Sequence, residues 1–247
     1  MLVLIPPSET KRSGGGFVRL DWAALSYPKL ATRRRSLATA LVRISQDTDT
    51  AMAALKLGRT QAAEIERNRH LLSSAAMPAL DRYTGVLFDA LDAASLTPTE
   101  RSFAAESLVV HSALFGPLGA LDPIPAYRLS HDSRIPDHAL KQHWGTAIAD
   151  VFAASTGLIL DCRSQGYVAL GRAPVRSNSV FLHVVTLGSD GHIRALNHFN
   201  KTAKGLLTRA LLQNSAHFDT VTELCDWAAT AGFDLRHTAA DSVTLVV

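Results

Sequence analysis

Residues 2–11 read LVLIPPSETK, which is four apolar residues, two prolines and a polar tail. A short continuous apolar run with such a boundary is typical of a buried strand. Pro6 and Pro7 end the strand, because proline has no N–H to donate to a sheet. The segment therefore predicts a buried strand that carries polar side chains at its end, where mixed sheets often place a functional site.

Outside this segment, helices and short strands are mixed without strict alternation. Helical spacing of apolar residues predicts helices within 31–74, broken at Gly58, and TPTE at 97–100 predicts a helix start with a capping box. Further strands are expected at 107–114, 158–161, 180–187, 192–199, 235–237 and 242–247, and further helices at 201–213 and 220–231. The strands that flank SDG at 189–191 predict a β-hairpin. The pattern indicates an α+β fold, a mixed α/β sheet with flanking helices, in one domain over residues 1–247.

The composition narrows the class of protein. The chain of 247 residues is 47% hydrophobic and 19% charged, which suits a packed core, and its net charge of +3 is compatible with a polyanionic partner without requiring one. No apolar run is long enough to span a membrane, and the N-terminus does not resemble a signal peptide, so we expect a cytoplasmic protein with no membrane partner. Cys162 and Cys225 are expected to be free thiols, with a bridge as the alternative. Metal-ligand spacings are missing from the sequence, so we expect neither a metal nor a cofactor.

The tail of the first strand is the first candidate site. The hydroxyl of Ser8 can bind a phosphate oxygen, and Lys11 can supply a positive charge. The segment is not a Walker A motif, because the GxxxxGK[ST] order is missing. An ordinary turn is the alternative.

A glycine turn is the second candidate. LFGPLGALDPI at 114–124 places Gly116 and Gly119 in a predicted tight turn with exposed N–H groups. A helix-hairpin-helix element holds a DNA phosphate with such a turn, and a plain tight loop is the alternative. Tyr127 and Arg128 follow directly, and an arginine can bind phosphate with two hydrogen bonds.

DCRSQGY at 161–167 is the third candidate, because it follows an apolar strand and again places polar groups at a strand end. Arg163, Ser164 and Tyr167 are its candidate site residues. The alternative is that Ser164 caps a helix and that Arg163 is solvated.

KTAKG at 201–205 is the fourth candidate. Lys201 and Lys204 lie one helical turn apart at a predicted helix N-terminus, where cations oppose the helix dipole unless an anion offsets them. One of the two lysines could instead have a lowered pKa and act as a nucleophile or base. Two exposed lysines that point away are the simplest alternative. A basic cluster, Lys29, Arg33–Arg35 and Arg43, is either a solvated helix face or a phosphate-contacting patch.

Together these motifs resemble the YaaA family of peroxide stress proteins. The resemblance rests on LIPPSETK at 4–11, YTGVLFDAL at 83–91, residues 112–129, HWG at 143–145, DCRSQGY at 161–167 and KTAKG at 201–205. It implies a cytoplasmic protein that limits peroxide damage by lowering free iron, and a DNA-binding protein of unusual fold with a helix-hairpin-helix element at residues 115–124. The chain departs from the enterobacterial pattern at Gln165 and Gly166, where that branch has acidic residues, and at Lys204, where it has arginine.

Two functional hypotheses follow. The first is a stress protein that binds double-stranded DNA through the glycine turn and basic side chains. The second is an enzyme acting on a nucleobase, nucleotide or other small anionic substrate, with Lys201 or Lys204 as nucleophile or base and with Ser164 and Tyr167 in the site. One concave pocket that gathers the polar strand-end residues would favour the enzyme, and one convex basic face would favour DNA binding. Direct sequestration of iron is disfavoured, since no cluster of carboxylates and histidines has ligand spacing.

Overall fold

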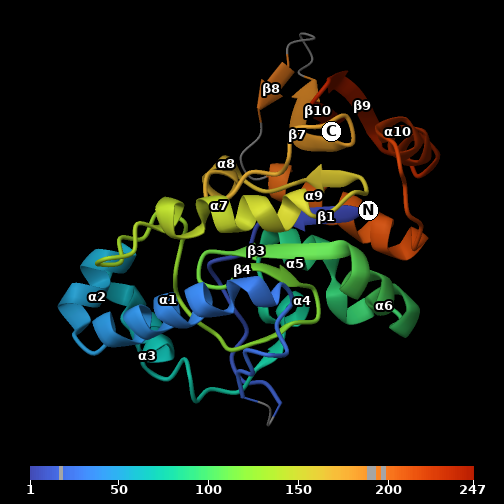
Figure 1. The fold of residues 1–247 in the computed structure, drawn as a ribbon. Helices are drawn as coiled ribbons and strands as arrows, with labels where there is room; N and C mark the ends of the chain where they lie inside the picture. The colour runs from blue at the N-terminus through green and yellow to red at the C-terminus, as the bar shows by residue number, and fades with distance from the viewer. Residues whose placement is uncertain (17–18, 188–192, 196–198) are drawn as a thin grey trace.

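A computed structural model describes residues 1–16, 19–187, 193–195 and 199–247 of the chain (Figure 1). Within this part, eight strands form a mixed sheet in the order β4–β3–β1–β6–β7–β10–β9, with β8 paired to β7. Their bounds are β1 Leu2–Ile5, β3 Leu108–Ser112, β4 Gly116–Gly119, β6 Ile159–Asp161, β7 Ser179–Leu187, β8 Ile193–Ala195, β9 Asp234–Ala239 and β10 Ser242–Val246. A separate antiparallel pair joins β2, Met77–Pro78, to β5, Pro123–Ile124.

The strand at residues 2–5 is buried, as the sequence predicts, and lies in the middle of this sheet. β1 is parallel to β3 on one side and to β6 on the other, and Val3, Leu4 and Ile5 are buried. The chain therefore runs from β1 to β3 on one side and later reaches β6 on the other side. β6, β7 and β10 continue in parallel, while β4, β8 and β9 run antiparallel to their neighbours.

Ten helices accompany the sheet in the described part of the chain. They are α1 Ala31–Ile44, α2 Thr48–Leu55, α3 Ala63–Arg69, α4 Ala79–Arg82, α5 Val86–Leu91, α6 Pro98–Ser107, α7 Leu140–Ala153, α8 Gln165–Val168, α9 Phe199–Asn214 and α10 Val221–Thr230. The helices α1–α3 gather at one end of the molecule, and β9, β10 and α10 lie at the other (Figure 1). The predicted α+β class is confirmed.

Local signals in the sequence place several of these elements correctly. Thr97 caps α6 by accepting from Glu100 N at 3.3 Å, and the Glu100 carboxylate accepts from Thr97 N at 2.7 Å, so the predicted capping box is present. Gly58 lies between α2 and the next short turn. β7 and β8 pair as a hairpin, although its SDG turn at 189–191 lies outside the described residues.

The predicted helix-hairpin-helix turn is wrong. Gly116 and Gly119 are buried in β4, which pairs antiparallel with β3, so no helix begins at either glycine. Arg34 explains why the chain takes this course: its guanidinium is fully buried and donates to the carbonyls of Phe115 and Pro117, each at 2.7 Å. The amide of Gly119 also has an internal partner, a carboxylate oxygen of Asp122 at 3.0 Å. The two glycines therefore belong to a strand and do not form the turn between helices that the sequence predicts.

Two further observations concern a membrane span and a metal site. The longest apolar helices among the described residues fall short of what a membrane crossing requires. The same part of the chain contains no group of three or more His, Cys, Asp or Glu side chains placed to hold a metal ion. Cys162 and Cys225 are both free, as expected, and Cys162 is buried.

Candidate functional site

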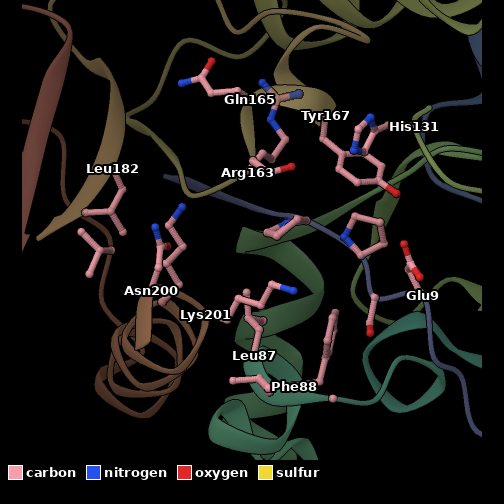
Figure 2. Close-up of a pocket in the computed structure, with 18 of the residues that line it drawn as sticks. Glu9, Leu87, Phe88, His131, Arg163, Gln165, Tyr167, Leu182, Asn200 and Lys201 are labelled. Atoms are coloured by element: carbon pink, nitrogen blue, oxygen red, sulfur yellow. The ribbon is translucent and has the colours of Figure 1, made fainter. Parts of the chain in front are cut away.

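A cavity of about 760 Å³ lies at the carboxyl ends of β1 and β6 and against β7. The chain reverses its direction of travel across the sheet between β1 and β6, and such a point opens a crevice for ligands in parallel sheets. Figure 2 shows side chains from several elements converging there. The lining consists of residues 6–10, 85–88, 130–131, 163–165, 167, 181–185, 200, 201 and 204.

The loop after β1 forms one wall of the cavity. The hydroxyl of Ser8 lies 3.1 Å from that of Thr10, which donates to the carbonyl of Thr84 at 3.1 Å. Gly85 allows this close approach, because it has a φ of 99° and an added Cβ would lie 3.2 Å from both hydroxyl oxygens. Only glycine adopts that backbone conformation readily. The predicted Ser8 therefore lines the cavity, held by its neighbours.

Lys11 lies behind this wall and does not line the cavity. Its Nζ donates to the carbonyls of Ser8 at 3.0 Å and Glu9 at 3.2 Å, and it lies 4.2 Å from the centre of the Tyr127 ring. Burial, and then the nearby charge of Arg128, lower the pKa of Lys11 to about 7. In this arrangement the amine of Lys11 is turned inward and holds the loop.

Tyr127 and Arg128 also support the wall from behind. The Tyr127 hydroxyl is buried between those of Tyr83, at 2.7 Å, and Ser112, at 2.6 Å, so it is not available to a ligand. The Arg128 guanidinium donates to the Glu9 carboxylate at 2.8 Å, and its side chain is only 9% exposed. Arg128 therefore orients a lining residue and does not itself line the cavity.

Arg163 is buried, although one alternative from the sequence placed it in solvent. Its guanidinium is fully buried and donates to both carboxylate oxygens of Asp161, at 2.8 and 2.5 Å. A further bond runs from Nη1 to Nδ1 of His111 at 2.7 Å, which leaves the imidazole proton on Nε2. Burial, followed by the charge of Arg163, lowers the pKa of His111 well below its ordinary value. The charge of Arg163 is thus neutralised within the protein and is not free to bind a ligand.

The rest of the segment after β6 faces the cavity. Ser164 is exposed and precedes α8, but its side chain makes no capping hydrogen bond, so its predicted capping role is not observed. Tyr167 lines the cavity with its ring edge-on to His131, 5.1 Å between centres. Burial raises the pKa of the Tyr167 hydroxyl, which therefore stays protonated at neutral pH.

The two lysines of α9 both reach the cavity but differ in burial. Lys201 is exposed, whereas Lys204 is 6% exposed and lies 5.6 Å from the centre of the Phe181 ring. Burial lowers the pKa of Lys204, while Cys162 and Asp161 nearby raise it. Among the described residues, no side chain or carbonyl forms a hydrogen bond or ion pair with the Lys204 amine. The arrangement combines an accessible cation with a desolvated amine one turn away.

Comparison with known proteins is consistent with these motifs. The family model described as "Peroxide stress protein YaaA" matches residues 1–239. The chain belongs to the peroxide stress protein YaaA family. A UPF0246 protein of Corynebacterium efficiens is 39% identical over 254 residues, which cover 100% of both chains. A UPF0246 protein of Streptomyces coelicolor is 37% identical over 245 residues, which cover 96% of this chain and 92% of the relative.

The structure brings some of the predicted site residues of this YaaA-family protein together in the cavity and places others elsewhere. The cavity brings together Ser8, Ser164, Tyr167, Lys201 and Lys204, together with Arg163, whose charge is neutralised. Lys11, Tyr127 and Arg128 lie behind the cavity, and Gly116 and Gly119 lie in β4, away from its lining.

The predicted site lacks several polar residues that line the cavity, among them Glu9, His131 and Gln165. Glu9 and Gln165 belong to the strand-end segments that the sequence singles out, so the polar residues that follow each strand could have indicated both. His131 has no such signal, because the fold of the loop between β5 and α7 places it.

Proposed function

We propose that this YaaA-family protein is a cytoplasmic enzyme of the peroxide stress response that binds a small anionic substrate in the cavity. Lys204 acts as its base or nucleophile. The observation that carries the proposal is the convergence of both α9 lysines with the polar ends of β1 and β6 on one concave site. A perturbed amine such as that of Lys204, in a cavity at such a point of a sheet, is typical of active sites.

The two lysines have different roles in this proposal. Lys201 is exposed to solvent, and its side-chain amine attracts and orients the anionic group of the substrate. Lys204 is desolvated, and its lowered pKa gives it a larger neutral fraction at physiological pH than an exposed lysine has. A neutral amine can accept a proton or attack an electrophilic carbon.

Ligand binding tests the site. We expect phosphate-bearing small molecules to raise the melting temperature of the wild-type protein, and Lys201→Met to weaken their binding roughly tenfold, since a hydrogen bond to a charged group contributes about 1.5–3 kcal/mol. Lys141→Met, on the exposed surface of α7, is the matched control and should bind like the wild type. Binding that is insensitive to both cavity lysines would overturn the proposal.

The role of Lys204 is tested by chemistry. If Lys204 is a nucleophile toward carbonyl carbon, it forms a Schiff base with a small anionic aldehyde or ketone. Borohydride reduces this Schiff base to a stable adduct on Lys204, which peptide mass spectrometry detects. If it is a base, no adduct forms, but Lys204→Met abolishes turnover while Lys204→Arg retains ligand affinity. Full turnover of a substrate by Lys204→Met would exclude both roles.

DNA binding is a second candidate, favoured by exposed basic side chains on and beside α1. Lys29, Arg33, Arg35 and Arg43 are exposed, whereas Arg34 is buried and is not part of this surface. Such a surface binds phosphates without reading sequence, and the logarithm of its affinity falls linearly with that of the salt concentration. A gel-shift titration of wild type and Arg35→Ala across salt concentrations tests it. Equal affinity and equal salt slope for the two proteins would remove α1 from any DNA interface.

A further inference from the structure

The cavity carries opposite charges on its two sides. In Figure 2, Asn200 and Lys201 extend from one side, and Glu9 and His131 lie on the other. Lys201 and Glu9 belong to segments nearly two hundred positions apart in the chain, so the fold alone creates this polarity. A ligand that spans the cavity needs an anionic group at one end and hydrogen-bond donors at the other.

Glu9 is held ready to accept those donors. Arg128 donates to Oε2 of Glu9 at 2.8 Å, and Arg128 itself is only 9% exposed, which fixes the carboxylate from behind. The Glu9 side chain lines the cavity and remains 62% exposed, and no donor among the described residues occupies Oε1. Because an ionised carboxylate only accepts hydrogen bonds, its partner must present amino or ring N–H groups.

The space between the two ends is bounded by apolar and aromatic side chains. Leu87 and Phe88 of α5 form one boundary, and Tyr167 lies on the other side of the space (Figure 2). The Phe88 ring is oriented by stacking on Tyr83, with 5.3 Å between ring centres and 30° between the planes. Aromatic and apolar walls of this kind favour a planar ring.

The size of the cavity also constrains the ligand. Its volume of about 760 Å³ lies within the range of roughly 300–1,000 Å³ that is typical of pockets for organic ligands. Inorganic phosphate would occupy only the lysine side. The ligand must therefore join an anionic group to a planar body that carries N–H donors.

We propose that the ligand is a nucleoside monophosphate whose base carries an amino group, with its phosphate at Lys201 and its base edge at Glu9. This inference rests on the proposed function and specifies the substrate class of the same site. Lys201 binds the phosphate as a charged donor, and Glu9 accepts from the exocyclic amino group and an adjacent ring N–H where the base has one. Gln165, on a third side of the cavity, can donate to or accept from the sugar or the base.

Calorimetric titration with three matched ligands tests this assignment: guanosine 5′-monophosphate, guanosine and ribose 5-phosphate. We expect the nucleotide to bind the wild-type protein at least about tenfold more tightly than either fragment, because only it engages both ends of the cavity. Glu9→Gln keeps the side-chain shape and an acceptor for Arg128 while removing the charge. It should reduce the preference for the nucleotide over ribose 5-phosphate by about tenfold and leave the affinity for ribose 5-phosphate unchanged.

Two controls separate the possible outcomes. Lys201→Met should weaken the nucleotide and ribose 5-phosphate alike, and Glu106→Gln, on the exposed surface of α6, should weaken neither. If ribose 5-phosphate binds as tightly as the nucleotide and still depends on Lys201, the nucleotide assignment is overturned and the anion site stands. If neither phosphate ligand depends on the cavity lysines, the proposed function fails and this assignment fails with it.

Discussion

Lys11 lies directly behind the cavity wall, where burial opposes its charge while two carbonyls and the Tyr127 ring favour it. Its pKa of about 7 in the folded protein lies below the value of 10.5 for a free side chain. Between these values the unfolded chain binds more protons, so the free energy of unfolding rises with pH. We expect it to rise between pH 7 and pH 9, relative to Lys11→Met, by at most about 1.4 kcal/mol per pH unit. Urea unfolding of both proteins at each pH measures the difference, and parallel curves would show that Lys11 is not perturbed.

The buried ion pair of Arg163 with Asp161 leads to a prediction about stability. Replacing Arg163 by methionine leaves the Asp161 carboxylate buried without its partner, which costs about 3–5 kcal/mol in comparable pairs. Arg172→Met makes the same chemical change on an exposed side chain and should alter the free energy of unfolding by less than about 0.5 kcal/mol. Chemical denaturation of both variants measures the two values. Equal effects would mean that the Asp161–Arg163 pair contributes little.

At the level of elements, α9 reaches the cavity because it packs closely on α5. Gly205 permits this contact: an added Cβ would lie 2.3 Å from the carbonyl oxygen of Leu87 and 2.8 Å from Cβ of Ala90. We expect Gly205→Ala to destabilise the protein by about 1–3 kcal/mol, although alanine favours helices. Gly145→Ala in α7 meets no atom within 4 Å and should stabilise by about 0.5–1 kcal/mol. Thermal unfolding compares the two, and stabilisation by both substitutions would contradict close packing of α5 and α9.

Some elements of the fold could be predicted from the sequence and others could not. β1 and α6 were predictable, because an apolar run ended by prolines and a capping box with Thr97 are local signals. β4 was not, because its strand conformation depends on pairing with β3 and on Arg34, which is far away in the sequence. The strand-end segments that line the cavity are predictable for the same reason as β1. The inward turn of Lys11 was not, since tertiary packing decides which polar groups line a cavity and which support it.

At the level of the whole molecule, the strand order makes the cavity depend on both halves of the chain. β1 supplies one wall of the cavity and β6 the other, and these strands lie side by side although more than 150 positions separate them. Their pairing must form before the crevice exists. A site at this junction therefore requires the complete sheet, and we expect ligand binding and global folding to be coupled.

The interleaved order of the strands also predicts that residues 1–247 unfold as one unit. A fragment of residues 1–157 would leave the β6-facing edge of β1 unpaired, including the Leu2 amide that donates to the Leu158 carbonyl at 2.7 Å. The complementary fragment, 158–247, would expose the same edge of β6. Exposed edges of apolar central strands do not persist in stable domains. We therefore expect neither fragment to show a cooperative urea transition by far-UV circular dichroism, whereas the full chain shows coincident transitions by circular dichroism and by Trp144 fluorescence. A sharp transition in either fragment alone would mean that the chain contains two independent domains.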